Sequence, residues 1–96
     1  MNQKRATLDL SGCQYISEMH QRIKEALQFP EYYGENWDAF WDCINRECDI
    51  DHLTVVGSSK VAKELQPALQ TMIELLEENK EWWANSDTPF RYEIIS

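Results

Sequence analysis

The stretch PEYYGENWDAFWDC, residues 30–43, holds five aromatic and four acidic residues and contains no Lys, Arg or His. Asn36 suits the N-cap of a helix, because a short polar side chain can accept a hydrogen bond from the first helical turn. The apolar residues that follow have the spacing of one helical face: Trp37, Phe40, Trp41 and Ile44. The stretch therefore predicts a loop and then a helix that ends near Arg46.

The segment before this stretch predicts one strand and one helix. Polar and apolar residues alternate from Thr7 to Leu10, which indicates a short strand. Ser17 is then the expected N-cap of a helix, which should stop before Pro30 because a residue that precedes proline is kept out of the α region. The buried face of this helix is expected to be Met19, Ile23, Ala26 and Leu27.

The segment after the stretch begins with a second predicted strand. Residues 52–56 are rich in β-branched side chains, which favour a strand. Ser58 or Ser59 is expected to cap a short helix before Pro67. Two apolar residues would form its buried side: Val61 and Leu65.

The last third of the chain predicts a longer helix and a final strand. Pro67 suits a first helical turn, where its missing N–H is not needed. The apolar face of this helix is expected to be Leu69, Met72, Ile73, Leu76 and Trp83, with acids outside it at Glu74, Glu77, Glu78 and Glu81. Residues 90–94 alternate again and predict the third strand.

The resulting order is strand, helix, helix, strand, helix, helix, strand. Strands separated by helices usually pair in parallel through right-handed crossovers. The predicted fold class is therefore α/β, with a three-stranded parallel β-sheet covered by about four helices. No repeat, linker or low-complexity tract divides the chain, so residues 1–96 are expected to form a single domain.

Composition restricts the classes of partner. The chain has 17 acidic and 9 basic residues and a formal net charge of −8. Nucleic acids and anionic membranes are bound mainly through clustered Lys and Arg, so neither is an expected partner, and a basic protein is favoured instead. We find neither a membrane-spanning apolar run nor the apolar core of a secretory signal, and we expect a cytoplasmic protein.

The acidity is local, because residues 31–51 contain seven acids and one base, Arg46. Asp38 and Asp42 lie four residues apart and share one face of the predicted helix, which Asn45 extends. A solvated helix face is the simpler explanation. However, the stretch has more aromatic rings than one short helix and loop can bury, and exposed aromatics beside carboxylates are typical of a protein interface.

Other chemistries fit the sequence less well. Asp38 and Asp42 could form an acid–base pair, but such pairs need a cleft that separates their two environments. Cys43 could be a nucleophile with His20 or His52 as its base, yet it falls on the apolar side of the helix, and both histidines are expected at the surface or its boundary.

Metal and cofactor sites are not expected either. The acids around residue 50 lack the ligand spacing of a calcium loop, and no glycine-rich phosphate loop is present. The cysteines show neither zinc-ligand nor paired spacing, which predicts reduced and mostly packing residues: Cys13, Cys43 and Cys48.

The stretch FPEYYGENWDAFWDC, residues 29–43, resembles the core signature of the barstar family, whose members are intracellular inhibitors of a secreted bacterial ribonuclease. Less specific similarity covers most of the chain. In that family the loop and the following helix plug the ribonuclease active site, and a helix carboxylate takes the place of a substrate phosphate. The resemblance therefore implies a three-stranded parallel sheet and a protein that performs no chemistry.

The resemblance also implies roles for individual residues. Asp42 would be the phosphate mimic and Asp38 a second ion-pairing carboxylate, while Glu74 resembles a helical glutamate that supports the same face. Further partner contacts would come from Tyr32, Gly34, Asn36 and Trp41. Two departures fall where specificity is set: Trp37, where the family has a leucine and which we add to the partner-binding set, and Glu47, near a family tryptophan.

The leading hypothesis is an inhibitor that forms a one-to-one complex, as a monomer, with a basic extracellular-type ribonuclease and protects the producing cell. The alternative is an acidic adapter or regulatory module that keeps the fold but binds a protein other than a nuclease. A third hypothesis, an enzyme that uses Asp38 and Asp42, would require turnover without a protein partner.

Overall fold

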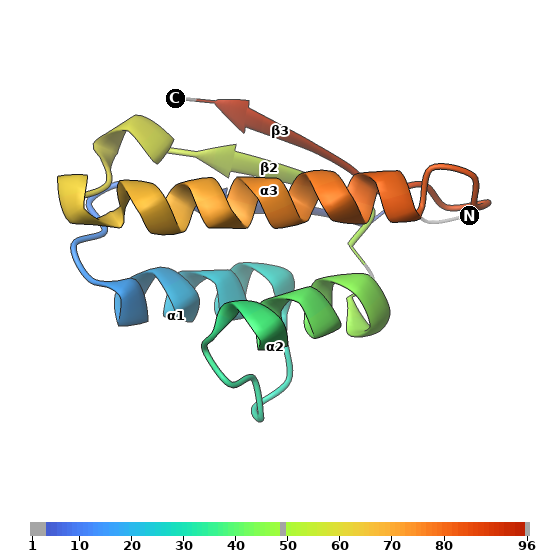
Figure 1. The fold of residues 1–96 in the computed structure, drawn as a ribbon, viewed down its shortest axis with the longest axis horizontal. Coiled ribbons are helices and arrows are strands. Elements are labelled where there is room, and N and C mark those ends of the chain that lie inside the picture. The colour runs from blue at the N-terminus through green and yellow to red at the C-terminus, as the bar shows by residue number, and fades with distance from the viewer. Residues whose placement is uncertain (1–3, 49, 96) are drawn as a thin grey trace.

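The computed structural model describes residues 4–48 and 50–95, and it contains one three-stranded sheet. The strands are β1 (Arg5–Asp9), β2 (His52–Val56) and β3 (Arg91–Ile95), paired in parallel in the order β1-β2-β3 (Figure 1). The predicted parallel sheet is confirmed. Strand β1 lies slightly earlier than the predicted Thr7 to Leu10, although Leu10 is still buried and donates its N–H to the carbonyl of Val56.

Three α-helices occur within the described residues: α1 (Ile16–Leu27), α2 (Trp37–Asp42) and α3 (Gln66–Trp82) (Figure 1). Helix α2 continues into a π-helical turn, Cys43–Glu47, so the two together end near the predicted Arg46. Pro67 lies in the first turn of α3, as expected. The α/β class is confirmed. The side chain of Glu47, the whole of Asp49 and the final residue of the chain lie outside the described part.

The predicted helix over 58–65 is wrong. This segment forms two separate 3₁₀ turns, Ser58–Lys60 and Lys63–Leu65, so the described residues contain three α-helices rather than about four. The backbone at Val61 is extended, and the N–H of Ala62 donates to the carbonyl of Cys13 at 2.8 Å. The N–H of Gly12 also donates to the carbonyl of Lys60 at 3.1 Å, so the middle of the segment bonds to the loop after β1 and the two turns do not join into one helix.

The start of α1 also differs from the prediction. The N-cap is Tyr15, which makes no side-chain cap bond, and Ser17 lies inside the first turn. Glu18 reaches back instead, and its Oε1 accepts a hydrogen bond from the backbone N–H of Gln14 at 2.9 Å. A carboxylate near this end is also favoured by the helix dipole.

The sheet buries one face only. Leu8, Leu53 and Val55 are buried, whereas the alternate strand positions such as Thr7 and Glu93 are exposed or half-buried. Both crossovers run in the same direction along the sheet, and right-handed crossovers then place all the helices on the same face. The core lies between that face and the helices, so the outer side of α2 is left free.

His20 is an exception to the surface placement expected from the sequence. It is only 2% exposed, and its Nδ1 lies 2.7 Å from the hydroxyl of Tyr33. The expected helical face is otherwise present: Met19, Ile23 and Leu27 are buried, and Ala26 is half-buried. His20 is tolerated in the core because it has a hydrogen-bond partner and packs against aromatic rings.

None of the helices in the described ranges is long and apolar enough to cross a bilayer.

Candidate partner-binding face

Tyr33 anchors the loop of residues 30–36 to the hydrophobic core. Its ring is buried, packs 5.1 Å from the ring of Phe29, and carries the hydroxyl that contacts His20. A turn from the Pro30 carbonyl to the N–H of Tyr33, at 3.0 Å, closes this part of the loop. The neighbouring Tyr32 is 72% exposed, so one tyrosine anchors the loop and the other faces solvent.

The second half of the loop is closed by Asn36. Its Oδ1 accepts a hydrogen bond from the N–H of Ala39 at 2.8 Å, which confirms the predicted N-cap, and its Nδ2 donates to the carbonyl of Gly34 at 3.2 Å. A Cβ on Gly34 would stand 3.1 Å from that Nδ2. Glu35 has a φ of 53°, which is uncommon for a residue other than glycine. The loop is therefore compact and held in one shape.

Helix α2 separates inner from outer side chains clearly. Phe40 is fully buried and touches the rings of Phe29 and Trp37 at centroid distances of 6.1 and 5.4 Å. Asp38 and Asp42 are exposed on the outer side, and Cys43 is buried. The predicted division of this helix into a core side and an acidic side is confirmed.

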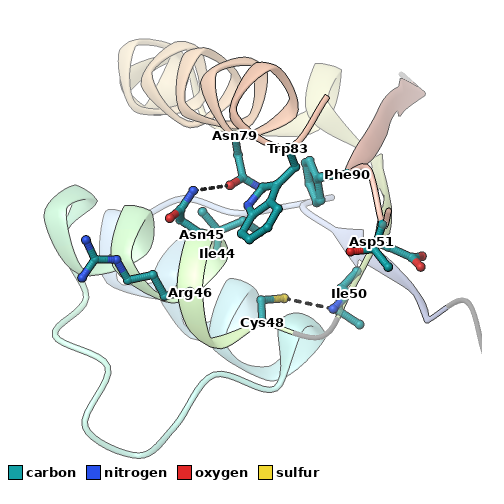
Figure 2. A pocket seen from close by; sticks show the side chains of 10 residues that line it. Ile44, Asn45, Arg46, Cys48, Ile50, Asp51, Asn79, Trp83 and Phe90 are labelled. Carbon is teal, nitrogen blue, oxygen red and sulfur yellow. Dashed lines mark hydrogen bonds between the residues drawn. The ribbon is translucent and has the colours of Figure 1, made fainter. Parts of the chain in front are cut away.

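Asn45 does not extend the acidic side, contrary to the prediction. It is buried, and its Nδ2 donates to Oδ1 of Asn79 in α3 at 3.1 Å (Figure 2). The helix widens to a π turn after Asp42, and a wider turn rotates each following side chain by a smaller angle than an α-helix does. Asn45 consequently turns toward α3 and lines a cavity of about 320 Å³. Arg46 also lines this cavity, but Figure 2 shows its guanidinium pointing away from Trp83.

A groove runs between α2 and α3, with a volume of about 490 Å³, and we call it the α2–α3 groove. Helix α2 lines it with Trp37, Asp38, Trp41 and Asp42, and helix α3 lines it with Thr71, Leu75 and Glu78. It combines carboxylates with half-buried tryptophan rings. Among the described residues, no Lys, Arg or His lines this groove.

A second hollow, of about 280 Å³, lies between the loop and α2, and we call it the loop hollow. It is lined by Tyr32, Tyr33, Gly34, Ala39, Asp42, Cys43 and one basic residue, Arg46. Asp42 lines both hollows, so this exposed residue lies between them. Any partner that fills both hollows must cover Asp42.

The acids of this face are not neutralised internally. Over the described part of the chain, Arg22 pairs with Glu18 and Lys24 with Glu31, and His52 lies 3.4 Å from Glu93, a contact that is an ion pair only when the imidazole is protonated. Asp38, Asp42 and Glu78 take part in none of them. An acidic surface that lacks internal partners attracts a basic one.

Seven of the eight residues predicted for partner binding line one of the two hollows or shape the loop of residues 30–36: Tyr32, Gly34, Asn36, Trp37, Asp38, Trp41 and Asp42. The eighth, Glu74, is exposed, accepts a hydrogen bond from Gln70 at 3.4 Å, and does not line the groove. Glu78, one turn further along α3, is the acid that lines it. The role of each residue stays a prediction.

From the sequence, the acids of residues 74–81 were open to two interpretations, a solvated helix face or a second rim of the binding surface, whereas Thr71, Leu75 and Trp82 were not identified. Thr71, Leu75, Glu78 and Trp82 recur at a helical spacing and so share one side of α3. Trp82 is 66% exposed, and its ring stands perpendicular to that of Trp41, with the centroids 6.2 Å apart. The spacing was visible in the sequence, but nothing there showed that this side of α3 meets α2.

The thiol and the two imidazoles considered for catalysis are less exposed to solvent than the carboxylates of Asp38 and Asp42. Cys43 is buried, His20 bonds to Tyr33, and His52 pairs with Glu93 at 3.4 Å. Burial lowers the pKa of His20 below its usual value, with Glu35 opposing the shift. No group of three or more His, Cys, Asp or Glu side chains suited to a metal ion occurs among the described residues.

Comparison with known proteins identifies relatives of the whole chain and of part of it. The model of the family described as Barstar (barnase inhibitor) matches residues 3–95. A protein of Bacillus subtilis (strain 168), named as the candidate ribonuclease inhibitor YrdF, is 38% identical over 53 residues. That match covers 55% of this chain and 57% of the relative, so the chain spans little more than half the length of the curated protein it matches.

Proposed function

The chain belongs to the barstar family, and on that premise we propose that it inhibits a basic ribonuclease by covering the active site of that enzyme. The contact surface would consist of the loop of residues 30–36, the outer side of α2 and the adjoining side of α3. The protein acts as a monomer in a one-to-one complex. It works in the cytoplasm and protects the cell from a ribonuclease of the extracellular type.

One observation carries this proposal: Asp42 is exposed on α2 and lines both the α2–α3 groove and the loop hollow. A ribonuclease active site binds phosphate through Arg, Lys and His side chains. A carboxylate that enters such a site can accept charge-assisted hydrogen bonds in place of the phosphate. Because the two hollows flank Asp42, the nuclease surface around its active site can fit against the inhibitor on both sides.

The rigidity of the face supports the same function. Asn36 bonds to the backbone on both sides of the loop bend, and Tyr33 ties the loop to His20 in α1. A loop that already has its bound shape loses little conformational entropy on binding, which favours high affinity. Phe40 fixes α2 to the core and thereby fixes the direction of Asp38 and Asp42.

Charge supports a basic partner rather than any other protein. Asp38, Asp42 and Glu78 carry like charges in one small region and have no cationic partner in the described structure. Like charges this close cost folding free energy. A basic partner offsets that cost on binding, and the acidic surface also accelerates its approach.

The test is a titration of barnase, the ribonuclease in the description of the family, and of further small basic bacterial ribonucleases with the purified protein. RNA cleavage should fall linearly and end near one equivalent for at least one of these enzymes. Cleavage that stays unchanged for every basic ribonuclease would refute the proposal. If the unmodified protein then binds a partner that is not a nuclease through this face, the alternative of an acidic adapter is favoured.

A further inference from the structure

We infer that Trp82 and Glu78 of α3 determine which ribonuclease is bound, by receiving one Lys or Arg side chain of the enzyme at the outer end of the α2–α3 groove. The inference rests on the proposed function, since it assigns a partner group to part of the same face. Neither residue belongs to the set that the sequence signature of residues 29–43 marks.

Trp82 is the most exposed tryptophan of the described chain, and it adjoins the groove without lining it. It is 66% exposed at the end of α3, and it reaches the groove through its perpendicular contact with Trp41. The next residue, Trp83, turns the other way and lines the cavity of Figure 2. Two adjacent tryptophans therefore have different surroundings, and only Trp82 offers its ring to a partner.

A single exposed apolar residue needs no functional explanation, but Trp82 is continuous with a larger surface. Trp41 joins it to the groove, and Leu75 adds an aliphatic patch on the side of α3 that faces α2. Tryptophans at the edge of a well-shaped hollow are typical of the few residues that dominate the affinity of an interface.

The chemistry of this end of the groove selects a long basic side chain. Glu78 lines the groove one turn before Trp82 and has no cationic partner in the described structure. A Lys or Arg can lay its methylene groups on Leu75 and the tryptophan rings while its charge reaches Glu78. The faces of the rings also attract a cation. A short or acidic side chain gains none of these contacts.

Under this inference, affinity and selectivity depend on different parts of the face, with Asp42 serving affinity and Trp82 selectivity. Asp42 lines both hollows and would enter the active site, where basic ribonucleases resemble one another because all of them bind phosphate. Trp82 lies beside the groove, outside its lining, and would meet the enzyme away from that site. Contacts at a rim can distinguish partners that share the same active-site chemistry.

The experiment compares the wild type with Trp82→Ala, Trp82→Phe and Glu78→Gln against barnase and a second basic ribonuclease that the wild type inhibits. Glu81→Gln is the matched control, because Glu81 is an exposed acid next to Trp82 that does not line the groove. Trp82→Ala should weaken the preferred complex by about tenfold or more, in the range of interface tryptophans. Glu78→Gln should weaken it by a smaller, salt-sensitive factor, and Glu81→Gln should have no effect.

A direct readout separates a contact from a loss of packing against Trp41. The indole N–H signal of Trp82, assigned by its absence in Trp82→Phe, should shift when one equivalent of nuclease is added to the wild type. Trp82→Ala should also narrow the difference in affinity between the two enzymes. Equal binding by Trp82→Ala with an unmoved indole signal would overturn the inference and leave the inhibitor function intact. Failure of the wild type to inhibit any basic ribonuclease would overturn both.

Discussion

The hydroxyl of Tyr33 lies 2.7 Å from Nδ1 of His20, so a buried hydrogen bond ties the loop of residues 30–36 to α1. The ring of His20 also packs 4.6 Å from that of Trp37, at the first residue of α2. One histidine thus supports both parts of the proposed binding face. Its protonation state should affect the whole face, because a charged imidazole is poorly accommodated in this apolar surrounding.

The free energy of unfolding should fall as the pH is lowered through the range in which His20 titrates. Burial lowers the pKa of His20 in the folded protein below its usual value of 6.5. Between pH 6.5 and the lower pKa of His20 in the folded protein, the unfolded chain therefore binds more protons than the folded one. The free energy of unfolding falls across that pH interval by up to about 1.4 kcal/mol per pH unit. Urea unfolding at a series of pH values from 7.5 to about 5 measures the slope.

His20→Gln is the control for this prediction. Glutamine cannot titrate, so the variant should be less stable at pH 7.5 but should show a flatter pH dependence than the wild type. Parallel pH profiles for the two proteins would contradict the assignment to His20.

Phe40→Ala should lower the free energy of unfolding by about 3 to 5 kcal/mol, the usual cost of removing a fully buried phenylalanine. Tyr32→Ala is the matched comparison, because Tyr32 lies in the same stretch but is 72% exposed. Its stability should stay within about 0.5 kcal/mol of the wild type, while its binding weakens. Chemical denaturation and nuclease titration together separate the two effects, and similar stability losses would contradict the division of the stretch into core and interface residues.

Gly57→Ala should be more harmful than Gly12→Ala, although both glycines have a positive φ, 74° and 79°. A Cβ at Gly12 meets no atom within 4 Å, so that change should cost only the left-handed backbone conformation, about 1 to 2 kcal/mol. A Cβ at Gly57 would lie 2.6 Å from the backbone nitrogen of Ser11. The resulting overlap should add about 1 to 3 kcal/mol. Equal melting temperatures for the two variants would show that this close approach is not maintained in solution.

Local signals in the sequence predicted much of the fold. The β-branched run over His52–Val56, the cap at Asn36 and the proline at the start of α3 each depend on neighbouring residues, and each is confirmed. The segment 58–65 was mispredicted because its backbone bonds to Cys13, which lies far away in the sequence. Helical spacing alone carries no information about such a partner.

The same distinction applies to the candidate face. Asp38 and Asp42 were placed on one side of α2 by spacing alone. The inward direction of the Asn45 side chain depends on a π turn that no local sequence pattern predicted. The burial of His20 depends on its contact with Tyr33, thirteen residues later in the chain. The meeting of Trp41 with Trp82 joins two helices whose relative position is set by the packed core.

Asp42→Ala compared with Asp38→Ala, in complex with a ribonuclease that the wild type inhibits, tests the central claim most directly. Both carboxylates are exposed on the same side of α2, but only Asp42 lines both hollows. Truncating one partner of a charge pair that becomes buried in a complex costs about 2 to 5 kcal/mol or more, a range that draws on measurements of the barnase–barstar complex. The account predicts a loss of this size for Asp42→Ala and a smaller one for Asp38→Ala, with unchanged stability in both. An Asp42→Ala variant that binds as tightly as the wild type would contradict it.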